Sequence, residues 1–86
     1  MRFERTGRFK RMYKKIDSRD QEQIKKALKL MSENIWHPSL RTKRVQGTKN
    51  VWEASASMNL RITFVWEEEV VILRNCGEHD NTLKNP

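Results

Sequence analysis

Four side chains in the C-terminal part of the chain have the chemical types needed to act on a phosphate ester: Glu53, Arg61, Arg74 and His79. A guanidinium group binds phosphate through two parallel hydrogen bonds, and an imidazole transfers protons near neutral pH. A carboxylate can act as a base or hold a neighbouring group in place. Cleavage of an RNA phosphodiester needs these groups. Surface ion pairs are the more common reason for a carboxylate and arginines to share one face of a sheet.

Alternating apolar and polar residues predict the strands that would position these side chains. Alternation covers residues 52–58 and 60–66, and an apolar run follows at 70–76. Asn59 and the acidic residues 67–69 predict the turns between them, so the three strands are expected to be antiparallel.

The alternation also predicts which side chains share a face of this sheet. Glu53, Ser55, Arg61 and Thr63 should lie on the face away from the core, because successive side chains point to opposite faces. If Val71 and Leu73 point into the core, Arg74 joins this set and His79 emerges where the last strand ends.

Two amphipathic helices precede the strands. Apolar residues with helical spacing predict a helix over 7–16, with Thr6 as its N-cap, and a second helix over 19–34. Ser18 and Gln21 are spaced as a capping box for the second helix. The short turn between the two helices predicts a helical hairpin.

The sequence therefore predicts a single α+β domain over residues 1–86, in which an antiparallel sheet of three to four strands carries the N-terminal helical hairpin on one face. The expected order is strand, helix, helix, strand, strand, strand. Residues 1–5 would supply the additional edge strand.

Positive charge is concentrated in the first half of the chain. Residues 1–49 hold 15 Lys and Arg against 5 Asp and Glu, whereas residues 50–86 hold 3 against 6. Such a surface attracts polyanions, of which nucleic acid is the commonest, although basic residues also simply solvate helices. The segment 37–50 has no helical pattern and is predicted to be a loop with at most a short strand near 43–46. Its basic residues are the predicted RNA-binding set: Arg41, Lys43, Arg44 and Lys49.

Composition excludes several other classes of protein. No apolar run is long enough to cross a bilayer, and the charged N-terminus lacks the apolar stretch of a signal peptide, which predicts a cytoplasmic protein. Cys76 is the only cysteine, so neither an internal disulfide nor a cysteine-based zinc site can form. We expect no cofactor and no metal.

Several segments, in this order, resemble small toxins of the RelE/ParE superfamily from bacterial type II toxin-antitoxin systems. They are HPSL, KRVQGTKNVWEA, LRITF and ILRNCGEHD, and with the helices the resemblance covers nearly the whole chain. It implies a metal-independent endoribonuclease that cleaves mRNA on the ribosome and so inhibits translation. It also implies a cognate acidic antitoxin as partner.

The resemblance implies roles for individual residues. Arg61 matches the strand arginine that binds the scissile phosphate, and His79 matches the C-terminal position of a general acid or base. Glu53, Arg74 and Asp80 are further candidates for the catalytic set.

Two other functions stay open. A ParE-like inhibitor of DNA gyrase would not need a histidine at this position. A toxin-like protein that binds RNA or the ribosome without cutting is the second alternative, because Ser55 and Leu60 stand where close relatives of the pattern carry arginine and tyrosine.

Overall fold

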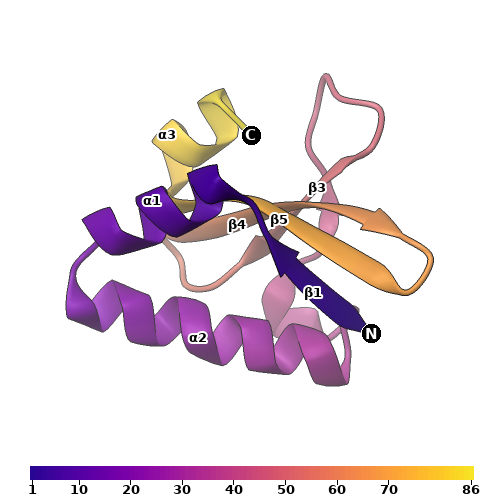
Figure 1. Ribbon diagram of the computed structural model, residues 1–86, viewed down its shortest axis with the longest axis horizontal. Coiled ribbons are helices and arrows are strands. Elements are labelled where there is room, and N and C mark those ends of the chain that lie inside the picture. The colour runs from indigo at the N-terminus through magenta and orange to yellow at the C-terminus, as the bar shows by residue number, and fades with distance from the viewer.

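The computed structural model describes residues 1–86, in which a mixed sheet separates helix α2 from helix α3 (Figure 1). The elements are β1 (Arg2–Arg5), α1 (Gly7–Lys15), α2 (Ser18–Glu33), the 3₁₀ helix η1 (Pro38–Leu40), β2 (Lys43–Arg44), β3 (Val51–Ser55), β4 (Leu60–Glu67), β5 (Val70–Glu78) and α3 (His79–Lys84). The α+β class and the helical hairpin are as predicted. No helix is long and apolar enough to cross a membrane.

The sheet has five strands in the order β1-β5-β4-β3-β2. This corrects the expected three to four strands. It also corrects the expectation of a wholly antiparallel sheet, because β1 pairs in parallel with β5, with Arg2 opposite Val70. The chain leaves β1 through both helices before it returns to the sheet, so β1 and β5 can run in the same direction. The short β2 lies at the other edge, within the predicted basic loop.

Both long helices begin at side-chain caps. Thr6 caps α1 as predicted, and its hydroxyl accepts a hydrogen bond from the backbone N–H of Phe9 at 3.1 Å. Asp17, rather than the predicted Ser18, caps α2 and accepts from the N–H of Asp20 at 2.9 Å. The carboxylate suits this position because it also interacts favourably with the positive end of the helix dipole.

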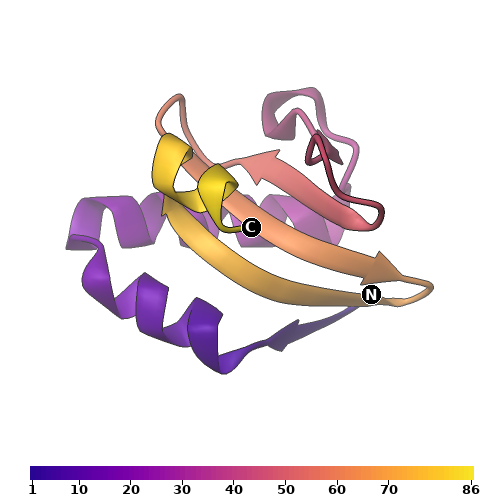
Figure 2. The ribbon, with the colours of Figure 1, turned by 90° about the horizontal axis from the view of Figure 1, so that it is seen from above.

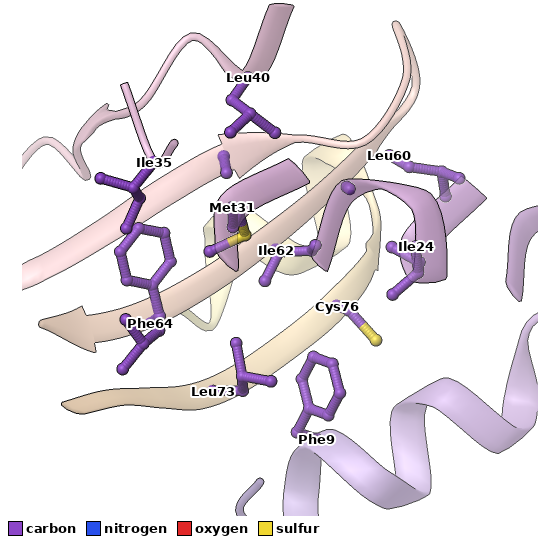
Figure 3. Close-up of a cluster of buried hydrophobic side chains, with 13 residues drawn as sticks. Phe9, Ile24, Met31, Ile35, Leu40, Leu60, Ile62, Phe64, Leu73 and Cys76 are labelled. Carbon is purple, nitrogen blue, oxygen red and sulfur yellow. The ribbon is translucent and has the colours of Figure 1, made fainter. Parts of the chain in front are cut away.

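The core lies between the hairpin and one face of the sheet. Phe9 of α1 and Ile24 and Met31 of α2 meet the inward side chains of β4 and β5 (Figure 3). Cys76 is fully buried in this cluster, and desolvation raises the pKa of its thiol to about 12. The thiol therefore stays protonated and unreactive at neutral pH.

The C-terminal helix α3 was not expected. The last strand runs to Glu78, beyond the predicted end at residue 76, and the Glu78 side chain then caps α3 by accepting from the N–H of Asn81 at 3.1 Å. Gly77 has a φ of 146°, which permits this turn, and a Cβ there would lie 3.2 Å from the Thr82 hydroxyl. Figure 2 shows α3 in front of the strands and α2 behind them, on the opposite side of the sheet.

Polar contacts hold the C-terminal segment against the sheet. The carbonyl of Pro86 accepts from the Thr63 hydroxyl and from Arg74 Nε, both at 3.1 Å. The carbonyl of Asn85 accepts from Asn75 Nδ2 at 3.1 Å. Thr63 and Asn75 are consequently buried, although alternation alone placed Thr63 on an open face. The β3 side of this face stays open.

Candidate functional site

A groove on this open part of the sheet gathers most of the predicted site. It has a volume of about 650 Å³ and lies between the 41–50 loop, the outward face of β3 and β4, and the start of α3. Six predicted residues line it and define the basic groove: Arg41, Lys43, Arg44, Glu53, Arg61 and His79. The groove thus combines several cations, one carboxylate and one imidazole.

The guanidinium of Arg61 is held by its own turn. Its Nη1 donates to the backbone carbonyls of Ser57 at 2.8 Å, Leu60 at 2.9 Å and Met58 at 3.2 Å. Only 12% of the side chain is exposed. The group is therefore fixed in position before any ligand arrives, and Nη2 is the nitrogen with no protein partner.

Glu53 is the neighbour of Arg61 on the adjacent strand. Its carboxylate lies 3.6 Å from Arg61 Nε, and only 7% of its side chain is exposed. Lys43 stands opposite Glu53 in the register of β2 and β3. The buried carboxylate therefore orients the guanidinium and partly balances the positive charge of the groove.

His79 occupies the first position of α3, rather than following the strand as a free end. Its backbone N–H donates to the carbonyl of Asn59 at 2.8 Å, which ties the start of α3 to the β3–β4 turn. Its ring Nδ1 lies 2.9 Å from Asp80 Oδ1, and 43% of the side chain is exposed. With Nδ1 engaged by a carboxylate, Nε2 is the nitrogen free to exchange a proton with a ligand.

Three predicted residues lie outside the basic groove. The β4–β5 register shifts after Thr63, so that Arg74 occupies a bulge and its Nε donates to the C-terminal carbonyl. Asp80 contacts His79 while 86% of its own side chain stays exposed. Lys49 does not line the groove. Arg74 thus contacts the carbonyl of Pro86, and Asp80 contacts the imidazole of His79.

Other groove residues were not among the predicted site residues. Gln46, Gly47 and Thr48 form part of the wall, and Leu83 reaches it from α3. The sequence position of the loop residues indicated that they could belong to the site, since they lie among the predicted basic residues. Arg44 has a second contact, because its guanidinium carbon lies 5.3 Å from the centre of the Trp52 ring. No group of three His, Cys, Asp or Glu side chains is arranged to hold a metal.

The backbone of Arg41 has a left-handed conformation. Its φ of 48° and ψ of 43° lie in the left-handed region, where a residue with a Cβ is strained. Glu68, in the turn between β4 and β5, is the only other non-glycine residue with a positive φ. The strain at Arg41 is found at the wall of the groove, whereas Glu68 lies away from it.

We expect Arg41→Gly to stabilise the fold while weakening the RNA binding that the sequence predicts for the 41–50 loop. Relief of the left-handed strain should exceed the entropy cost of glycine and leave a net gain of about 1 kcal/mol. For a domain of this size that gain raises the Tm by roughly 4–8 °C. Glu68→Gly is the matched control, since it should raise the Tm without lowering RNA affinity. Equal affinity of Arg41→Gly and the parent would contradict a role for Arg41 in binding.

Comparison with known proteins supports a particular fold. No protein-family model and no curated protein matches the sequence. Among solved structures, YafQ from E. coli strain BL21(DE3) aligns with a TM-score of 0.79 and 16% identity over 94% of this chain and 97% of its own. A YoeB/ParE toxin from Agrobacterium tumefaciens aligns at 0.75 and 14% identity over 92% and 99%.

A third similar structure includes a partner. The intact E. coli RelBE toxin-antitoxin complex contains a chain that aligns with a TM-score of 0.70 and 20% identity over 92% of this chain and 96% of that one. These alignments span nearly the full length of both chains, and the identities are too low to carry more than architecture. The chain described here therefore has the RelE/ParE-like toxin fold.

Proposed function

We propose that this chain is the toxin of a type II toxin-antitoxin pair and that it inhibits translation by cleaving mRNA on the ribosome. The observation that carries the proposal is the basic groove, in which Arg61, Glu53 and His79 lie together beside the cations of the 41–50 loop. The toxin fold supports the same reading.

The proposed reaction needs no metal. The 2′-hydroxyl of the substrate gives its proton to Glu53 or to water, and its oxygen attacks the adjacent phosphorus. The bond to the 5′-oxygen breaks, and a 2′,3′-cyclic phosphate remains. Arg61 would stabilise the negative charge on the non-bridging oxygens, because its fixed guanidinium requires little reorganisation. His79 Nε2 would give a proton to the departing 5′-oxygen, which leaves as a hydroxyl.

Glu53 is proposed as a base or as the group that orients Arg61. Its ion pair with Arg61 Nε favours the orienting role. Arg41, Lys43 and Arg44 would hold the phosphates of single-stranded RNA that flank the cleaved bond, and the affinity should depend strongly on salt. An acidic antitoxin would complement the same charges and cover the groove.

Expression of the chain without a partner tests the proposal. Pulse labelling should show that protein synthesis stops, and mapping of RNA ends should reveal new 2′,3′-cyclic phosphates within messages. His79→Ala, expressed to the same level, is the control for toxicity that does not depend on cleavage. If protein synthesis continues while DNA supercoiling fails, the chain inhibits gyrase and the nuclease proposal is wrong. If translation stops without new RNA ends, the chain binds without cutting.

A further inference from the structure

A second hollow lies beside the basic groove and shares part of its wall. It has a volume of about 400 Å³ and is enclosed by α2, η1 and the turn between β3 and β4. Arg41, Ser55 and Arg61 line both spaces. We call this second space the α2 hollow. A ligand that extends past these three residues would therefore pass from one space into the other.

The α2 hollow combines an apolar floor with a cationic rim. Ala27, Leu30, Leu40 and Ala56 form the floor. Its charged lining residues are Lys26, Arg41 and Arg61, and no carboxylate is among them. A small apolar pocket with a few polar groups suits a flat, partly apolar ligand. The absence of acidic groups favours an anionic one.

Further features of the lining suit a nucleotide. The residues Ser39, Ser55 and Ser57 contribute to the wall, and serine hydroxyls both donate and accept hydrogen bonds. Met58 also lines the hollow, although 89% of this residue is exposed and the core does not use it. A flexible, polarisable methionine can close over an aromatic base. The fold itself gives this exposed side chain no packing role.

We infer that the α2 hollow binds the nucleotide next to the cleaved phosphodiester, with its base on the apolar floor and its phosphate against Lys26. The inference rests on the proposed function, because it extends the RNA path from the basic groove. RNA is favoured over an apolar peptide by the three cations and by the wall that the hollow shares with the groove. A volume of about 400 Å³ lies in the range of small-ligand pockets.

The phosphate part of the inference is tested with a single-stranded 2′-O-methyl RNA nonamer, which the proposed reaction cannot cleave. Lys26→Ala should weaken binding and reduce the slope of log K against log salt by about 0.7, as expected for one lost contact to a single strand. Lys25→Ala is the matched control, since Lys25 lies on the same helix and lines a different hollow, between α1 and α2. Equal slopes for the two variants would overturn the phosphate contact.

The base part is tested by placing one abasic site at each position of the nonamer in turn. One position next to the cleavage site should lose affinity for the parent protein. Ala56→Leu, which fills the floor, should bind the intact nonamer less tightly and lose nothing further from that abasic site. Additive losses would show that the base lies elsewhere and overturn the inference.

Failure of the inference can be told apart from failure of the proposed function. If the parent binds and cleaves RNA while the Lys26 and Ala56 variants behave as Lys25→Ala does, only the α2 hollow is excluded as an RNA subsite. The inference is also overturned if those two variants bind an acidic peptide less tightly than the parent does but bind RNA equally well. If the parent neither binds the nonamer nor cleaves mRNA on ribosomes, the proposed function and the inference fall together. Thermal unfolding of each variant confirms that a loss of binding is not a loss of fold.

Discussion

His79→Ala should slow single-turnover cleavage of a defined mRNA on ribosomes by about 10²- to 10⁴-fold, the usual contribution of a general acid or base. Binding of RNA should change little, because the cations of the 41–50 loop remain. Stability should stay within about 0.5 kcal/mol of the parent, since 43% of the side chain is exposed and its side-chain hydrogen-bond partner, Asp80, is itself exposed. Cleavage at the parental rate would mean that the acid is Glu53, Asp80 or a lysine of the loop.

A modified substrate separates proton donation from any other role of His79. If the bridging 5′-oxygen is replaced by sulfur, the leaving group departs as a thiolate and needs no proton. His79→Ala should therefore cleave this substrate at nearly the parental rate. Asp80→Ala is a useful comparison, because loss of the 2.9 Å contact at Nδ1 should free the ring and give an intermediate rate with the normal substrate. A sulfur substrate that stays slow with His79→Ala would assign the residue a positioning role.

The long elements of this fold follow from periodicity, and the short ones do not. The apolar residues of α1, α2, β3 and β4 recur in the sequence at the spacing of the element, and β5 carries a run of apolar residues. The direction of β1 has no such signal, because its four residues are mostly exposed and its partner is 68 positions away. Its parallel pairing depends on tertiary structure rather than on local sequence.

Helix α3 is the element that local sequence could least predict. Six residues are too few for a stable helix in isolation, so contacts with the sheet must supply the stability. The hydrogen bonds from Thr63, Arg74 and Asn75 to the last two carbonyls supply such contacts. These partners become visible only once the strands are assembled.

In the candidate site, too, some positions follow from the sequence pattern and others depend on the assembled structure. Alternation placed Glu53 and Arg61 on one face. Their ion pair is a diagonal contact between β3 and β4, because Glu53 stands opposite Thr63 and Arg61 opposite Ser55. Arg74 depended on unbroken alternation in β5, and the bulge after Leu73 redirects it toward the C-terminus. The three carbonyls around Arg61 also escape sequence analysis, because an arginine that binds its own turn has the same sequence signature as a free one.

Arg61→Ala should have two separable effects, one on stability and one on cleavage. It leaves the Glu53 carboxylate without its cation where only 7% of that side chain is exposed, which should cost roughly 3 kcal/mol of folding free energy. It also removes the charge that we propose for binding the phosphate, so both RNA binding and the rate of the bound complex should fall. A single variant cannot show which loss causes which effect.

A second substitution at Glu53 resolves the two effects. Arg61→Ala combined with Glu53→Gln removes the unpaired carboxylate, so urea unfolding should show that much of the lost stability returns. Cleavage by this double variant should stay as low as with Arg61→Ala alone, because nothing replaces the guanidinium. Arg61→Lys should cleave at a rate between those of the parent and Arg61→Ala, since an ammonium keeps the charge but lacks the planar, bidentate geometry of the guanidinium. If cleavage recovers together with stability in the double variant, Arg61 serves only to hold the β3–β4 turn, and another cation of the basic groove must bind the phosphate.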